Sequence, residues 1–241
     1  MSSALDPRDR TKPRLVMLTG TCAGIGKSTL AEGLARRLEE AGATVDLFGE
    51  HQIFVRADFA DVAEAFRSRQ SPTPELFLPT YARIFDGFRA ANAWGLFDWH
   101  CAGMAADLPW AIRDHSRLTQ LCLDVRELAD DMDPVLLDLV GDVRTATERA
   151  LAQRGDVWAK RYARIASDAG HTTGRIAERI AAWSQDQQGT LREQELAAMR
   201  TAGWPIIELD GTASAAEVLE QALDALAIAS PAALPTSREA G

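Results

Sequence analysis

The sequence predicts an α/β domain in which a five-stranded parallel sheet carries helices on both faces. Short apolar runs alternate along the chain with long amphipathic stretches, which is the pattern of strands connected by crossover helices. A glycine-rich segment lies between the first apolar run and the first amphipathic stretch. These observations predict a three-layer sandwich with a ligand-binding loop after its first strand.

Five apolar runs are predicted to form the strands, at residues 15–19, 44–48, 94–98, 135–140 and 205–209. Amphipathic periodicity predicts helices at residues 27–41, 57–68, 74–91, 116–130, 143–154 and 215–228. A further helical region, residues 161–201, is predicted to break near Gly170 and Gly189. Right-handed crossovers would assemble the strands into one sheet, with the ligand at their carboxyl ends.

The length of 241 residues fits a single domain, which we expect to span residues 14–228. Residues 1–13 and 229–241 are predicted to be flexible tails, because they are polar or small, contain proline and lack periodicity. Hydrophobic residues make up 46% of the chain and charged residues 25%, which is ordinary globular composition. The composition therefore excludes a disordered or fibrous chain.

Charge and hydropathy limit the expected partners. The net charge is −9 and no block of lysines and arginines forms a stripe, so we expect no nucleic-acid partner. No apolar run approaches the roughly 20 residues that cross a bilayer, so we expect no membrane partner. The start of the chain also lacks the apolar core of a signal peptide, which predicts a cytoplasmic protein.

The strongest motif is the segment LTGTCAGIGKSTL at residues 18–30, which matches a Walker A phosphate loop. Its small residues would let successive backbone N–H groups surround phosphate oxygens. Lys27 would reach the β- and γ-phosphates of ATP, and the Ser28 hydroxyl would coordinate Mg²⁺. Thr21 occupies the position of the first motif glycine. The residues predicted to bind the nucleotide are Thr21, Cys22, Ala23, Gly24, Ile25, Gly26, Lys27, Ser28 and Thr29.

Three landmarks resemble the P-loop kinases of small molecules, especially the thymidylate kinase and deoxynucleoside kinase group. They are the phosphate loop TCAGIGKSTL, the stretch PVLLDLVGDVRTATERALAQRGDVWAKRY from Pro134, and GWPIIELDGTASAAEVLEQALDAL from Gly203. The resemblance implies a P-loop NTPase fold of nucleoside monophosphate kinase type. It also implies ATP and Mg²⁺ as cofactors, an acceptor-binding region at about residues 50–115, and an arginine-bearing lid at about residues 149–162. A homodimer is suggested by the same analogy.

Two carboxylates end neighbouring predicted strands. Asp98 follows the third apolar run, where it could orient Mg²⁺-bound water or hold a substrate hydroxyl. In the resembled group an arginine usually follows this carboxylate, whereas here Trp99 does. Glu50 follows the second run, and it matches by position the glutamate that receives the acceptor proton in deoxynucleoside kinases. The alternatives are that Asp98 caps a turn and that Glu50 is a surface carboxylate.

Arginines of the predicted lid could stabilise the charge that phosphoryl transfer spreads over the equatorial oxygens. We expect this role for at least one of Arg149, Arg154 and Arg161, with Arg154 the first choice because Gly155 follows it. Solvated surface arginines are the alternative.

The residues predicted to contact the acceptor are Arg56, Tyr81 and Arg83, between the second and third strands, and Trp99, directly after the third strand. Aromatic residues in this region are also explained by core packing, because several repeat at helical spacing. These residues do not separate a hydroxyl acceptor from a phosphate acceptor.

The function predicted first is therefore an ATP-dependent phosphotransferase that acts on a small molecule, most simply a nucleoside or nucleotide. A kinase of a hydroxylated natural product or antibiotic is an alternative, because residues 50–110 show no clear base-reading motif. A regulatory P-loop ATPase without a small acceptor and a nucleotide-binding protein without catalysis are the other hypotheses. The sequence lacks the N-K-x-D motif of GTPases and the L-S-G-G-Q signature of transport ATPases.

Overall fold

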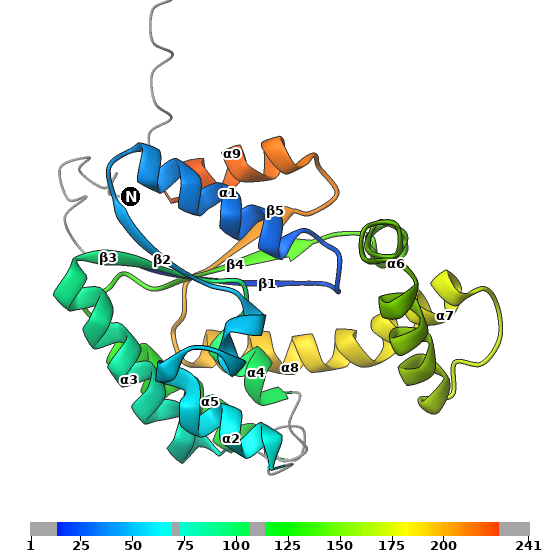
Figure 1. The fold of residues 1–241 in the computed structure, drawn as a ribbon, viewed down its shortest axis with the longest axis horizontal. Coiled ribbons are helices and arrows are strands. Elements are labelled where there is room, and N and C mark those ends of the chain that lie inside the picture. Colours follow the sequence, from blue (N-terminus) through cyan, green and yellow to red (C-terminus); the bar gives the residue numbers. More distant parts are fainter. Residues whose placement is uncertain (1–13, 69–72, 107–113, 227–241) are drawn as a thin grey trace, which may run out of the picture.

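A computed structural model describes residues 14–68, 73–106 and 114–226 (Figure 1). Both predicted tails, residues 1–13 and 229–241, lie outside the described residues. The strands are β1 (Leu15–Gly20), β2 (Thr44–Phe48), β3 (Ala93–Phe97), β4 (Val135–Val140) and β5 (Ile206–Asp210). The α-helices are α1 (Lys27–Glu40), α2 (Ala60–Arg67), α3 (Pro74–Ala91), α4 (Cys101–Ala106), α5 (His115–Leu128), α6 (Val143–Asp168), α7 (Ile176–Trp183), α8 (Gly189–Thr201) and α9 (Ala215–Ala225).

The five strands form one parallel sheet in the order β2-β3-β1-β4-β5, which confirms the predicted fold class. β1 lies at the centre, between β3 and β4. The chain order reverses direction across the sheet at this strand, and the carboxyl end of such a central strand is where open α/β sheets bind ligands. The glycine-rich loop leaves β1 at this position.

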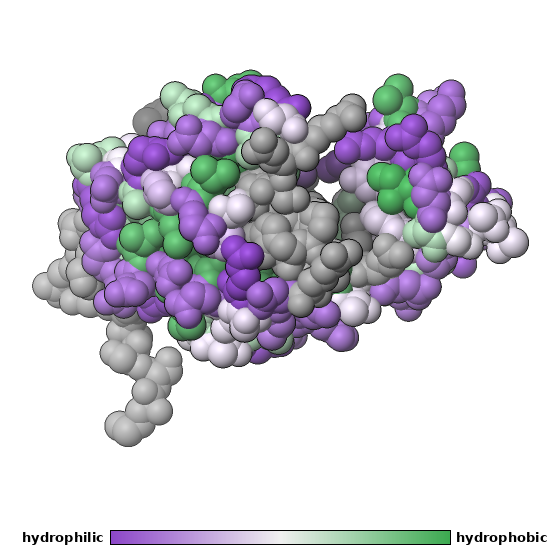
Figure 2. Space-filling view, turned by 90° about the horizontal axis from the view of Figure 1, so that it is seen from below, coloured by the Kyte–Doolittle hydropathy of each residue, from purple (hydrophilic) through white to green (hydrophobic). Residues whose placement is uncertain are grey.

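Helices cover both faces of the sheet (Figure 1). Successive residues of β1 point to opposite faces: Leu15 and Met17 join the core on the side of α3, α5 and α8, whereas Val16 and Leu18 join the core under α1 and α9. All four side chains are buried, as expected for a central parallel strand. On the outer face shown in Figure 2, hydrophilic residues predominate and hydrophobic residues form small groups.

The helices after β4 differ from the prediction in detail. α6 continues to Asp168, but Gly155 (φ 69°, ψ −168°) interrupts its helical conformation, so the predicted helix end at residue 154 corresponds to a kink. The predicted break near Gly170 is present, because α6 ends there and α7 starts at Ile176. At Gly189 no break occurs, since a single π-helical turn, η3 (Ser184–Gln188), connects α7 to α8.

Short helices were missed where the apolar periodicity is weak. A 3-10 turn, η1 (Glu50–Phe54), follows β2. A second one, η2 (Ala57–Phe59), was not missed, because it forms the start of the helix predicted at residues 57–68 and leads into α2. α4 follows β3 directly, in a segment that the sequence left unassigned. These three elements matter for the site, because they hold the residues that follow the carboxyl ends of β2 and β3. No helix within the described ranges is long and apolar enough to cross a membrane.

Buried charges connect α8 to the lower face of the sheet. Asp138 of β4 is fully buried and forms an ion pair with Arg192. His100, buried just after β3, accepts a 3.1 Å hydrogen bond at Nδ1 from the backbone N–H of Gly103. Its Nε2 therefore carries the proton, which it donates over 3.0 Å to Glu195 of α8. These polar contacts fix α8 beneath β3 and β4.

Candidate active site

The loop between β1 and α1 has the geometry of a phosphate-binding loop. Gly24 (φ 87°) and Gly26 (φ 113°) both adopt backbone conformations that side chains with a Cβ rarely reach, and Gly26 is the N-cap of α1. The first turn of α1 contains Lys27, Ser28 and Thr29. Backbone N–H groups and the positive end of the helix dipole therefore face the same space, which suits an anion.

Thr21 is accommodated at the motif's first glycine position because it needs no left-handed backbone. Its N–H donates a 3.0 Å hydrogen bond to the carbonyl of Leu139, and its hydroxyl donates a 3.2 Å bond to the carbonyl of Gly141. Among the described non-glycine residues, positive φ values occur at Asn92 and Asp133 and not at Thr21. Thr21 therefore links the loop to the carboxyl end of β4 through two hydrogen bonds.

The two predicted carboxylates meet at the serine of the loop. The Ser28 hydroxyl donates a 3.1 Å hydrogen bond to Oδ2 of Asp98, and the backbone N–H of Glu50 donates a 2.9 Å bond to Oδ1 of the same carboxylate. The pKa of Asp98 is raised above its ordinary value, mainly because the carboxyl group is buried and also because the Glu50 carboxylate is near. The two hydrogen bonds and the charge of Lys27 act in the opposite direction. The carboxyl ends of β1, β2 and β3 thus supply one shared polar centre.

Ser28 and Asp98 fit a magnesium ion by the chemistry of their donors. Both offer hard oxygen atoms, 3.1 Å apart, beside the loop that would hold phosphates. Mg²⁺ usually takes one or two protein oxygens and completes its shell with water and substrate phosphates. The described residues contain no cluster of three or more His, Cys, Asp or Glu side chains that could hold a metal ion by themselves. The donor set therefore suits a metal that arrives with a nucleotide.

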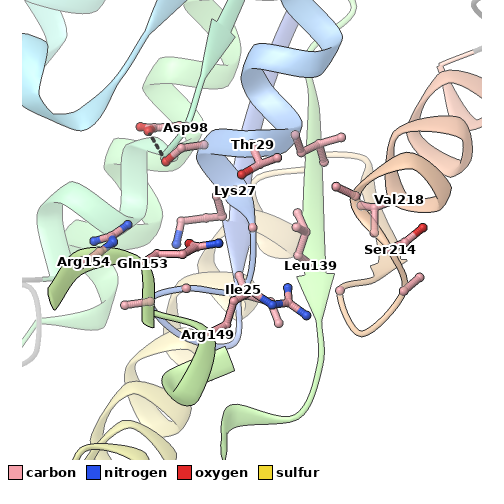
Figure 3. Close-up of a pocket in the computed structure, with 18 of the residues that line it drawn as sticks. Ile25, Lys27, Thr29, Asp98, Leu139, Arg149, Gln153, Arg154, Ser214 and Val218 are labelled. Carbon is pink, nitrogen blue, oxygen red and sulfur yellow. Dashed lines mark hydrogen bonds between the residues drawn. The ribbon is translucent and has the colours of Figure 1, made fainter. Parts of the chain in front are cut away.

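A cleft of about 470 Å³ opens over this centre (Figure 3). From one side it is lined by the phosphate loop together with Glu50 and Asp98. From α6 it is lined by Arg149, Gln153 and Arg154, and Figure 3 shows Arg154 and Gln153 near Lys27, with Arg149 beside Ile25. Two arginines of the predicted lid segment, residues 149–162, thus line the same cleft as the phosphate loop.

Several cleft residues were not predicted. Gln153 and Tyr162 come from α6, and Ser214 and Val218 come from the start of α9. Ser214 is the N-cap of α9, where its hydroxyl accepts a hydrogen bond from the N–H of Glu217 and the Glu217 carboxylate accepts one from the N–H of Ser214. This capping box was readable from the spacing S-x-x-E, although its position at the cleft was not. Tyr162 is placed by the continuation of α6 beyond Gly155.

The remaining predicted site residues lie away from the cleft lining. Arg161 is exposed on α6. Tyr81 is fully buried and Trp99 is 7% exposed, both within the aromatic core around Phe97. Arg56 pairs with Asp46 and Asp58, and Arg83 donates to the carbonyl of Asp58. Substrate contacts by these residues stay predictions, and the packing accounts for their present positions.

Two solved structures have a similar chain course. A sugar kinase from Janibacter sp. HTCC2649 gives a TM-score of 0.45 at 16% sequence identity, over 90% of this chain and 96% of that chain. A gluconokinase from Sinorhizobium meliloti 1021 gives a TM-score of 0.44 at 16% identity, over 90% of this chain and 93% of that chain. No protein-family model matches the sequence, and no curated protein matches it. The resemblance to thymidylate and deoxynucleoside kinases stays a prediction.

Proposed function

We propose that this protein is a phosphotransferase that moves the γ-phosphoryl group of ATP to a small acceptor. The observation that supports the proposal is the convergence, in one cleft, of the Walker A loop, the hydrogen-bonded pair Ser28 and Asp98, and two arginines of α6. Phosphoryl transfer requires a phosphate cradle, a metal-binding pair and positive charge around the moving group. A glycine-rich turn without a ligand would need none of the residues outside the loop.

Each group has a role that follows from its position. The loop N–H groups and Lys27 would bind the β- and γ-phosphates, while Ser28 and Asp98 would hold the magnesium ion. Bound Mg²⁺ would neutralise charge on the phosphate oxygens. In Figure 3, Arg154 lies on the side of Lys27, where it would approach the transferred group, and Arg149 lies beside Ile25. The predicted lid segment would exclude water when it closes over the nucleotide.

The acceptor would enter on the side of Glu50 and Asp98, where the carboxyl ends of β2 and β3 meet. We propose a nucleoside or nucleotide as the first acceptor class, on the resemblance noted in the sequence, and a hydroxylated natural product as the second. The acceptor-binding region proposed at residues 50–115 includes residues 69–72 and 107–113, which lie outside the described residues. The Glu50 side chain lines the cleft and is exposed, so a substrate hydroxyl can reach it.

The proposal is tested by measuring ADP formation from ATP and Mg²⁺, first without an acceptor and then with pools of nucleosides, nucleoside monophosphates and hydroxylated antibiotics. We expect one pool to stimulate ADP formation, and Lys27→Ala to abolish the stimulation. Arg36→Ala provides a matched cation control, because Arg36 is exposed on α1 outside the cleft. Rapid turnover that no acceptor changes would instead identify an ATPase and overturn the proposal.

A further inference from the structure

We infer that the acceptor is a hydroxyl compound that carries no phosphate or carboxylate near the reacting oxygen. This inference rests on the proposed phosphotransferase function and narrows its substrate class. It follows from the distribution of charge around the cleft: the carboxylates stand at the acceptor end, and the cations stand at the nucleotide end. The sequence left a hydroxyl acceptor and a phosphate acceptor equally open.

The acceptor end of the cleft is acidic. Glu50 and Asp98 both line it, and the Glu50 N–H to Asp98 Oδ1 hydrogen bond of 2.9 Å keeps the start of η1 against the end of β3. One oxygen of Asp98 is engaged by that N–H and the other by Ser28. The exposed Glu50 carboxylate is therefore the anionic group most open to an acceptor at this end.

Cations that line the cleft belong to its nucleotide side. They are Lys27 of the loop and Arg149 and Arg154 of α6. A phosphoryl donor already brings several negative charges to these three groups. An anionic acceptor would need further cations of its own, usually an arginine fork that matches the planar oxygens of a phosphate or carboxylate.

Described arginines on the acceptor side are already engaged by the protein. Arg56 makes hydrogen bonds of 2.8 Å and 3.1 Å to the two oxygens of Asp46 and one of 3.0 Å to Asp58. Its guanidinium also lies 3.8 Å from the ring centroid of Phe48, which fixes its plane.

The other acceptor-side cations have partners as well. Arg67 donates to the carbonyl of Phe54 and pairs with Glu64 at 3.7 Å. Arg83 donates to the carbonyl of Asp58 and to the Thr80 hydroxyl, and it pairs with Asp61. From below the sheet, Arg192 is neutralised by Asp138. Each of these four arginines, Arg56 included, thus has a partner within the protein, and none of them lines the cleft in the part of the chain that the structure describes.

A hydroxyl acceptor uses this arrangement directly. Its oxygen forms the new bond to the γ-phosphorus, the bond between that phosphorus and the β,γ-bridging oxygen breaks, and ADP leaves with that oxygen. The hydroxyl proton passes to a carboxylate oxygen of Glu50 and then to water. A phosphate acceptor would instead place a dianion beside the Glu50 carboxylate, and the repulsion between these like charges would disfavour its binding.

Binding of adenosine 5′-tetraphosphate tests the inference without knowledge of the acceptor. Its terminal phosphate extends past the γ-position toward Glu50, so its Kd measures how the acceptor end receives an anion. We expect it to bind no more tightly than ATP to the wild-type protein, both measured with Mg²⁺ by calorimetry. Glu50→Gln should tighten the tetraphosphate relative to ATP by about three- to tenfold, up to about 1.4 kcal/mol.

Glu39→Gln serves as the matched control, because Glu39 is an exposed glutamate at the end of α1 outside the cleft. In this variant the ratio of the Kd for the tetraphosphate to the Kd for ATP should equal that of the wild type. A tetraphosphate that binds the wild type tenfold more tightly than ATP, with no gain in Glu50→Gln, would overturn the inference while the phosphotransferase proposal stands. If ATP binds equally to the wild type and Lys27→Ala, the proposed function fails instead.

Measurement of ADP formation with different acceptors provides a second test of the inference. Thymidine and adenosine are compared with their 5′-monophosphates as acceptors under the same conditions. Stimulation of ADP formation by a nucleoside or by an uncharged hydroxylated antibiotic supports the inference, and stimulation by a monophosphate alone overturns it. When none of these compounds stimulates, the ratio of the two Kd values decides.

Discussion

The fully buried carboxylate of Asp138 in β4 is paired with the guanidinium of Arg192 on α8. Each side chain also has a buried atom, Asp138 Oδ1 and Arg192 Nε, without a hydrogen-bond partner among the described atoms. The ion pair is thus the main compensation for the complete burial of the Asp138 carboxylate and the partial burial of Arg192. Removal of one partner should therefore destabilise the protein, whereas replacement of both partners by apolar residues should not.

Asp138→Ala should lower the free energy of unfolding by about 3–5 kcal/mol, because it leaves the Arg192 charge buried without its partner. Chemical denaturation followed by circular dichroism measures the change. The double variant Asp138→Leu with Arg192→Met should recover most of the loss, since an apolar pair of similar volume needs no compensation. Equal destabilisation by the single and double variants would show that the unpaired charge is not the cause of the loss.

Gly24→Ala should weaken ATP binding at least tenfold. A Cβ at Gly24 would lie 2.5 Å from the carbonyl oxygen of Ala146 and 2.6 Å from the Cβ of Ala150, so α6 would have to move away from the loop. The φ of 87° adds backbone strain in any residue with a Cβ. Calorimetric titration with ATP and Mg²⁺ measures the effect.

Gly87→Ala is the matched control for this substitution. Gly87 lies inside α3 and nothing stands within 4 Å of its added Cβ, so the variant should bind ATP normally and gain about 0.5–1 kcal/mol of stability from its helix propensity. Normal ATP affinity in Gly24→Ala would mean that α6 does not depend on close contact with the loop.

Local patterns in the sequence predicted the features that depend on residues close together in the chain. The order of strand, glycine-rich loop and helix predicted the local structure around Lys27 and Ser28, because it follows from a few consecutive backbone conformations. Asp98 was singled out at the end of a predicted strand, and in the structure it follows β3 and accepts a hydrogen bond from Ser28. Arg56 was predicted to contact the acceptor, because the sequence could not show that its guanidinium pairs with Asp46 of β2 in the fold.

Long-range pairs were hidden for the same reason. Asp138 looked like an ordinary position in an apolar strand, since its partner Arg192 is 54 residues away and meets it only when α8 docks. Tyr162 was predicted to lie in the lid segment and at the start of a separate helical region. The sequence could not show that this region continues α6 beyond Gly155 and that it brings Tyr162 to the cleft. The sequence therefore predicted most helices and strands, but it did not predict the side-chain contacts between them.

ATP binding should weaken as the pH falls through a range above that of an ordinary aspartate. Burial raises the pKa of Asp98, so the proton competes with Mg²⁺ for this carboxylate at a higher pH than usual. Because the folded-state pKa is raised, Asp98 contributes stability below its unfolded pKa, and this contribution is lost as the pH rises through the folded value. The Kd of ATP with Mg²⁺, measured from neutral pH down through the range of an ordinary aspartate, follows the titration.

Glu50→Gln tests the cause of the shift, since the Glu50 carboxylate contributes to the raised pKa of Asp98. Without this like charge, Asp98 should titrate at a lower pH, and the pH at which ATP binding weakens should move down with it. The exposed Glu39→Gln variant should leave the profile unchanged. An identical midpoint in the wild type and Glu50→Gln would exclude an interaction between the two carboxylates.

Arg154→Ala should lower kcat by roughly 10³-fold with a smaller change in KM for ATP, if its guanidinium acts on the transferred phosphoryl group. Arg154 lines the cleft, and its guanidinium lies 5.8 Å from the ring centroid of Trp158, which holds the arginine next to the kink at Gly155. Arg164→Ala removes an exposed arginine from the same helix and should keep wild-type kinetics. Steady-state kinetics with an acceptor that stimulates ADP formation supply both constants. A loss confined to KM would make Arg154 a binding residue, and a loss in Arg161→Ala alone would transfer the catalytic role to Arg161.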